Sequence, residues 1–231
     1  MSRRIPSPTR AVPLAALLAL SAGVATAQAP VADSSAAARR GFADSWFWGV
    51  KGGAARFGTI TDDGRKIAPL AGFDWLITRR RAALLLSGEQ QFFQHTSAVA
   101  EPGDPGMGRV VDLKNARRYS ASVLAVPGML GRVRPYVGLG LAFDVMDDVT
   151  PRGDFASMSQ RSAVHDQIDE ASSKASMLLV AGGQVQFGRA ALFLQGNGTP
   201  AQTRSLWNRG GATQLEFGFR YNLAPAKDRE L

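Results

Sequence analysis

The stretch VRPYVGLGLAFDV at residues 133–145 decides the fold. Every odd-numbered residue in it is apolar, whereas the even-numbered residues are charged, small or, at Tyr136, amphipathic. A repeat of two places alternate side chains on opposite faces of a β-strand. The stretch therefore predicts a strand with one face toward an apolar environment and the other toward a polar one.

Residues 212–223 carry the same pattern, and six further segments carry it with more interruptions. Each segment is near the ~9 to 11 residues that a tilted strand needs to cross a bilayer. The eight predicted strands are residues 45–59, 67–78, 82–93, 117–127, 133–145, 174–187, 189–197 and 212–223.

The connections between these strands alternate in length. Short connections lie at residues 79–81, 128–132 and 188–189, and long ones at residues 58–66, 94–116, 146–173 and 198–211. Transmembrane barrels alternate short periplasmic turns with long outer loops. We therefore predict an all-β chain that forms an eight-stranded antiparallel up-and-down transmembrane β-barrel in the outer membrane of a bacterial cell.

The first residues have the composition of a secretory signal. Arg3, Arg4 and Arg10 precede an apolar run at residues 12–24, and an Ala-Thr-Ala cleavage site follows at residues 25–27. The chain is expected to divide into a signal peptide at residues 1–27, a flexible periplasmic leader at 28–44, the barrel at 45–223 and a tail at 224–231.

Composition narrows the function classes. The chain has no cysteine, which excludes disulfides, thiolate metal sites and a lipid-bearing cysteine. Loss of the three signal arginines lowers the formal net charge from +8 to +5. The basic residues form no sustained run, so a nucleic-acid partner is not expected.

The aromatic residues are expected to form two bands, as they do at the two interfaces of a membrane. Given the predicted topology, both bands lie on outward faces. The periplasmic band holds Trp46, Trp75, Phe187 and Tyr221, and the outer band holds Phe92, Tyr119 and Phe143.

The segments Arg134–Phe143 and Glu216–Leu223 resemble strands of the small outer-membrane β-barrel families, the group that includes OmpA-like and OmpX-like proteins. The resemblance covers roughly residues 45–223. It implies the same fold, and it implies that the barrel-assembly machinery recognises an assembly signal in the last strand. That signal would comprise Glu216, Gly218, Tyr221 and Leu223. Family members usually end on an aromatic residue, whereas this chain continues through residues 224–231.

Nine charged residues are predicted to face the interior. An eight-stranded barrel is filled by side chains, so these charges must pair, and we predict an interior charge network that fixes strand register. A gated ion or proton path is the alternative. The nine residues are Lys51, Asp74, Glu89, Arg118, Arg134, Asp144, Lys174, Glu216 and Arg220.

Two kinds of chemical site are weaker alternatives. A lipid A-modifying enzyme would need a general base, for which His95 is available near Ser97 and Glu101, although no histidine–serine motif of such enzymes is present. A loose divalent-cation site could form at His165 with the acids of the longest loop, but no fixed-spacing motif supports it. Those acids are Asp147, Asp148, Asp154, Asp166, Asp169 and Glu170.

A soluble periplasmic calyx, whose apolar faces would point inward toward an apolar ligand, is the third alternative. We predict instead a monomeric membrane protein without cofactor or enzymatic activity, whose partners are outer-membrane lipid, the assembly machinery and an extracellular partner. Residues 94–116 and 146–173 are the expected binding loops. Arginine at Leu139 should destabilise the barrel, whereas a polar residue at the inward Gly140 should be tolerated better.

Overall fold

The computed structural model describes residues 42–59, 65–101, 104–202, 206, 208 and 210–224. The predicted signal peptide, most of the predicted leader and residues 225–231 lie outside the described residues.

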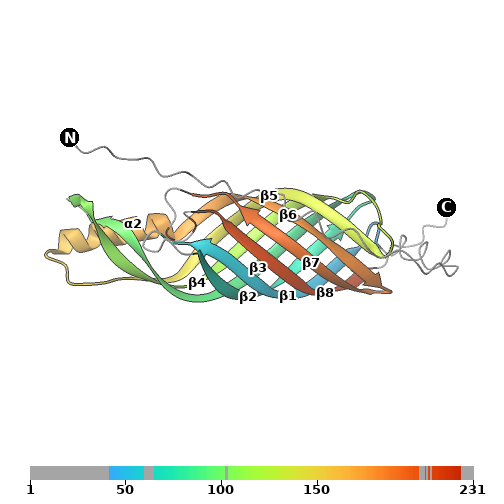
Figure 1. The fold of residues 1–231 in the computed structure, drawn as a ribbon, viewed down its shortest axis with the longest axis horizontal. Helices are drawn as coiled ribbons and strands as arrows, with labels where there is room; N and C mark the ends of the chain where they lie inside the picture. The colour runs from blue at the N-terminus through green and yellow to red at the C-terminus, as the bar shows by residue number, and fades with distance from the viewer. Residues whose placement is uncertain are drawn as a thin grey trace, which may run out of the picture. The chain divides into compact units, whose positions relative to one another are not determined.

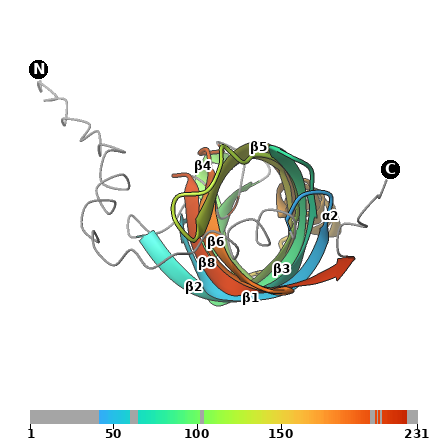
Figure 2. The same cartoon turned by 90° about the vertical axis from the view of Figure 1, so that its right-hand side faces the viewer.

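Eight strands form one closed antiparallel barrel, in which each strand pairs with its neighbours along the chain (Figures 1 and 2). The barrel closes where Val50 on the first strand pairs with Phe219 on the last. The strands are β1 (Trp46–Gly58), β2 (Arg65–Thr78), β3 (Ala82–Glu101), β4 (Asp104–Ala125), β5 (Val133–Pro151), β6 (Ser173–Phe187), β7 (Ala190–Thr199) and β8 (Ala212–Ala224). The predicted fold class is therefore confirmed.

The strand boundaries match the prediction closely at the end of the barrel that carries the short connections, here called the turn end. At the other end, the loop end, three strands are longer than predicted. β3 continues to Glu101, β4 begins at Asp104, and β5 continues to Pro151. Residues 94–116 are thus mostly a β-hairpin, because backbone pairs such as Ser97 with Val111 extend the ladder. The predicted long connection at residues 94–116 is therefore built largely from extensions of β3 and β4.

The apolar faces of the strands point outward. On β5, Val133, Val137, Leu139, Leu141 and Phe143 are all exposed, with Leu141 at 65%. Ten residue steps of about 3.3 Å, tilted by about 40°, give this belt a height of about 25 Å, the height of the apolar band of outer-membrane barrels. The calyx alternative is wrong, because it requires these faces to point inward.

All seven aromatic residues of the two predicted bands lie on the outer wall and are at least 38% exposed. Trp46 packs edge-on against Trp75 at 5.6 Å between ring centroids, near the turn end. Tyr119 and Phe143 are register partners on β4 and β5, toward the loop end. The wall also carries exposed aromatic residues outside the predicted bands, namely Trp48, Phe73, Phe217 and Phe219.

Two apolar clusters fill the two ends of the barrel interior. The turn-end cluster comprises Phe42, Phe47, Leu76, Ala83, Leu85, Leu124, Val126, Tyr136, Ala142, Leu178 and Val180. The loop-end cluster comprises Phe57, Ala68, Phe93, Val99, Val111, Leu113, Ala116, Met146, Val164, Ile168, Leu206 and Ala212. Between them, the inward positions of the same strands carry polar side chains.

Phe42 belongs to the predicted leader, yet it is only 2% exposed and joins the turn-end cluster. Its ring lies 5.9 Å from that of Phe47, and its carbonyl accepts a hydrogen bond from the Thr78 hydroxyl. Asp44 then pairs with Arg79 at 2.6 Å. The end of the predicted leader is therefore a plug in the turn end of the barrel, since burial of a phenylalanine ring favours that position.

One helix, α2 (Met158–Ser172), lies between β5 and β6 beside the extended strands (Figure 1). Val164 and Ile168, four residues apart on one face, are buried in the loop-end cluster. The Ser157 side chain caps the helix by accepting a hydrogen bond from the Gln160 amide. Among the described residues, no helix combines the length and the apolar composition needed to cross a membrane.

Gly140 does not tolerate a side chain, contrary to the expectation from its inward position. A Cβ atom there would lie 2.2 Å from the Ala121 carbonyl oxygen and 2.2 Å from the Ser122 hydroxyl oxygen. We expect Gly140→Ala to lower the free energy of unfolding by about 1–3 kcal/mol, as overpacking does. Gly198→Ala, which meets nothing within 4 Å, is the matched control. Urea unfolding in lipid vesicles measures both, and equal effects would contradict the packing argument.

Candidate functional site

Seven of the nine predicted interior charges meet in one layer between the two apolar clusters, here called the polar layer. Each is at most 6% exposed. They are Lys51, Asp74, Glu89, Arg118, Asp144, Glu216 and Arg220. Strand alternation places all seven on inward faces, and the barrel's small diameter brings them within contact distance of one another.

Lys51 forms the first centre of the polar layer. Its ammonium donates to Glu89 at 2.7 Å and to Glu216 at 2.9 Å, so one cation pairs with two carboxylates, one on β3 and one on β8. Gln214 donates to Glu89 at 2.5 Å, and Asn197 donates to Glu216 at 2.8 Å. These amide donors satisfy carboxylate oxygens that a single lysine cannot reach, as a buried charge requires.

Arg220 forms the second centre and is fully buried. Its guanidinium donates to both Asp74 oxygens, at 2.7 and 3.1 Å, and its plane lies 3.8 Å from the centroid of the Phe193 ring. It also donates to Gln184 at 3.1 Å and to Gln195 at 3.2 Å. Because Gln195 in turn donates to Glu216, hydrogen bonds connect the first two centres.

Arg118 and Asp144 form the third centre. They are direct register partners on β4 and β5, and two parallel hydrogen bonds of 2.6 and 3.1 Å join them. A bidentate pair between adjacent strands holds those strands in one register, because a slip of one strand by one residue would turn its charge toward the outer wall and leave the other charge unpaired.

The other two predicted interior charges lie outside this layer. Arg134 sits at the turn end with its guanidinium 3.9 Å from the centroid of the Phe42 ring. Lys174 is the register partner of Asp144, but Arg118 occupies that carboxylate, and Lys174 forms no ion pair with any described residue. The polar layer therefore holds three cations and four carboxylates.

The prediction missed the amides that complete the polar layer. They occupy inward positions on β3, β6, β7 and β8, where the alternation pattern could have placed them. They are Gln91, Gln184, Gln195, Asn197 and Gln214, each at most 8% exposed.

The structure describes contacts of two members of the candidate catalytic group, Ser97 and His95, whereas the Glu101 side chain lies outside the described residues. The Ser97 hydroxyl donates to the Leu206 backbone carbonyl at 2.7 Å, and the His95 ring stacks on Phe93 at 5.8 Å. His165 lies 6.4 Å from the Phe155 ring, between ring centroids. In the part of the chain that the structure describes, no three histidine or acidic side chains gather in a way that could hold a metal ion.

The loop end carries a structured extension, here called the platform, made of β3 from Phe92, β4 up to Ala116, β5 from Met146, and α2. Arg109 fastens it, since its guanidinium donates to the Arg152 carbonyl at 2.9 Å and covers the Phe155 ring at 4.3 Å. Residues 146–173 therefore form a strand and a packed helix rather than the expected loop.

An ion pair also braces the exposed edge of the platform. Arg152 donates to both carboxylate oxygens of Asp112, at 2.7 and 2.8 Å, and these hydrogen bonds hold the pKa of Asp112 below its ordinary value. The outward side of α2 remains exposed, with Met158 at 79%. This side offers a polar surface that includes Arg161, His165, Asp166, Asp169 and Glu170.

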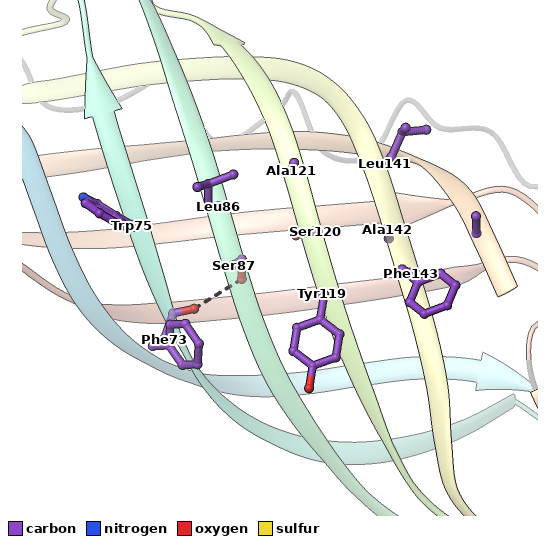
Figure 3. A pocket seen from close by; sticks show the side chains of 11 residues that line it. Phe73, Trp75, Leu86, Ser87, Tyr119, Ser120, Ala121, Leu141, Ala142 and Phe143 are labelled. Carbon is purple, nitrogen blue, oxygen red and sulfur yellow. Dashed lines mark hydrogen bonds between the residues drawn. The ribbon is translucent and has the colours of Figure 1, made fainter. Parts of the chain in front are cut away.

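An apolar hollow of about 560 Å³ lies on the outer wall (Figure 3). Phe73, Tyr119 and Phe143 lie along one row of the register, and Gly88 occupies the β3 position between Phe73 and Tyr119. A Cβ atom at Gly88 would lie 2.8 Å from the Phe73 ring, so any larger residue at this position would displace the ring. The next row of the register has only the small side chain of Ala121 on β4, which leaves space beside the aromatic rings.

The four residues of the predicted assembly signal lie on β8. Glu216 faces the interior within the polar layer, whereas Tyr221 and Leu223 are exposed on the outer wall. Gly218 stands where a Cβ atom would lie 2.7 Å from the Phe193 ring. In the folded barrel, therefore, only part of the signal is accessible.

A closed eight-stranded antiparallel barrel, apolar outside and filled inside, is the class of protein that this fold and this interior define. Among solved structures, the chain is similar to Neisserial surface protein A, with 10% identity over 77% of this chain and 97% of that one and a TM-score of 0.49. It is also similar to the outer membrane protease OmpT from Escherichia coli, with 7% identity over 78% of this chain and 97% of that one and a TM-score of 0.36. No protein-family model and no curated protein matches the chain. The fold assignment rests on the closed strand register.

Proposed function

We propose that this protein is a monomeric integral outer-membrane barrel whose filled interior does not conduct, and whose platform presents a surface for an extracellular partner. The polar layer carries this proposal, because three cations and four carboxylates pair inside a barrel whose outer wall is apolar. An apolar wall suits lipid, and closure leaves no strand edge within the lipid-facing part of the barrel.

The two ends of the barrel indicate its orientation. Short turns face the periplasm in outer-membrane barrels, which would place the platform outside the cell. Acyl chains of the surrounding lipid would fill the hollow between Phe73 and Phe143. We further propose that the barrel-assembly machinery recognises β8 before Glu216 is buried. The contacts of Ser97 and His95 favour a structural and binding role over an enzymatic one.

Single cysteines test the orientation, since the chain has none of its own. Ser159 on α2 and Arg80 in the β2–β3 turn are exposed at opposite ends of the barrel. In intact cells, a 5-kDa polyethylene glycol maleimide should label Ser159→Cys and not Arg80→Cys. After permeabilisation of the outer membrane, it should label both.

A heat-dependent shift in gel mobility of the membrane fraction serves as the folding control for both cysteine variants. Labelling of Arg80→Cys alone in intact cells would reverse the proposed orientation. Recovery of the folded protein from the soluble periplasmic fraction would overturn the membrane placement itself.

Planar-bilayer recording tests the filled interior. Because the polar layer is at most 6% exposed at each charge, ions have no hydrated route past it. The protein is expected to give no steady conductance above that of a lipid-only bilayer. A reproducible unitary conductance from folded protein would contradict the non-conducting interior and favour the gated ion path.

A further inference from the structure

A pocket of about 290 Å³ opens at the turn end between the β2–β3 turn and the β4–β5 turn. Its described lining contains three arginines and no acidic residue. The lining residues are Arg80, Arg81, Val126, Pro127, Gly128, Met129 and Arg134. The Val126 amide donates to the Arg81 carbonyl at 2.8 Å, which ties the two turns together and fixes the pocket's walls.

Two arginines of this pocket, Arg80 and Arg81, differ from the neighbouring arginine at residue 79 in their ion pairing. Arg79, the neighbour of Arg80, pairs with Asp44 at 2.6 Å. In contrast, Arg80 and Arg81 are exposed and form no ion pair with any described residue. Arginines that line a concave site can donate hydrogen bonds to the oxygens of a phosphate group.

An apolar wall rises directly from the pocket toward the middle of the barrel. Leu84 and Val123 are register partners on β3 and β4, and Val137 on β5 is the partner of Ala125, two residues closer to the pocket along β4. All three are exposed, Val123 at 65%. A ligand that places a phosphate in the pocket could therefore lay acyl chains along this wall.

We propose that the arginine pocket binds the phosphate of an anionic phospholipid in the periplasmic leaflet, with the acyl chains against Leu84, Val123 and Val137. This inference rests on the proposed membrane placement and orientation. It adds a specific lipid site to a wall that would otherwise meet lipid without selectivity, and it gives the exposed Arg80 and Arg81 a role beyond their position in a turn.

Native mass spectrometry of the folded chain in neutral detergent tests the site with phosphatidylglycerol and phosphatidylcholine as probes. The unmodified protein is expected to retain phosphatidylglycerol selectively. The double variant Arg80→Gln/Arg81→Gln should bind it about 25-fold more weakly, because each basic residue near an anionic surface contributes about fivefold. Arg65→Gln/Arg161→Gln removes two exposed arginines at the loop end and should bind it normally.

Three results would overturn the site. They are unchanged retention in Arg80→Gln/Arg81→Gln, an equal loss in Arg65→Gln/Arg161→Gln, and equally tight binding of soluble glycerol 3-phosphate, which would point to a free phosphate ester. A heat-dependent mobility shift confirms that each variant is folded. If the proposed membrane placement is wrong, cell fractionation would show it separately, because the folded protein would be found in the soluble fraction.

Discussion

Replacing Asp74 by alanine is expected to lower the free energy of unfolding by about 3–5 kcal/mol, the cost of leaving a buried charge without its partner. Asp74 is fully buried, and both of its carboxylate oxygens accept hydrogen bonds from the Arg220 guanidinium. Gln184 and Gln195 would still accept from Arg220, but neither carries a compensating charge. Urea titration of the protein refolded into vesicles, followed by tryptophan fluorescence, measures the loss.

Asp112→Ala is the matched control for this prediction. Asp112 forms an equally short pair with Arg152, at 2.7 Å, but both side chains are solvent-accessible. Water compensates the remaining charge there, so the loss should be far smaller than at Asp74. Losses of equal size would show that burial does not set the strength of these pairs.

A double variant separates the charge from the packing. Asp74→Leu/Arg220→Met removes both charges and keeps apolar volume, and it should cost less than Asp74→Ala alone, because replacement of a whole buried pair is often close to neutral. If the double variant loses as much as the sum of the single changes, the two side chains stabilise the barrel independently of their ion pair.

The alternation of residues predicted which face each strand turns inward, but not how deep along the barrel each residue lies. It correctly places Lys51, Glu89 and Glu216 on inward faces, where the structure joins them. It also places Arg134 inward, yet that residue lies at the turn end against Phe42, outside the polar layer. Depth depends on strand register, which single strands do not encode.

The platform escaped prediction because its alternation is interrupted. Asn115 on β4 has a positive φ of 58°, and the β3–β4 register shifts between Gln91 and Gln94. The buried residues of β4 are odd-numbered before this bulge, at Val111 and Leu113, and even-numbered after it, at Ala116 and Arg118. The helix α2 buries only Val164 and Ile168, which gives a weak apolar periodicity. The burial of Phe42 was missed for a different reason. A single apolar residue outside a strand belongs to no alternating pattern, so the sequence does not indicate which way its side chain points.

Arginine at Leu139 is expected to cost about 2–4 kcal/mol of unfolding free energy, the cost of a charged side chain on the lipid-facing wall near the bilayer midplane. Leu139 lies 61% exposed on β5, between Val137 and Leu141, so no protein group would pair with the new guanidinium. Val133→Arg supplies the control on the same face of the same strand. Val133 lies at the turn end of the belt, where the same change should cost about 0–1 kcal/mol because the side chain reaches the interface.

Urea unfolding in vesicles compares the two arginine variants, and the same titration in detergent micelles isolates the contribution of the bilayer. A gap between the variants that appears only in vesicles is the expected result. Equal losses at Leu139 and Val133 in vesicles would mean that the wall does not experience a gradient of polarity along its height. The exposed apolar belt would then have to be buried by another protein surface, and the membrane placement from which the orientation of the platform follows would be lost.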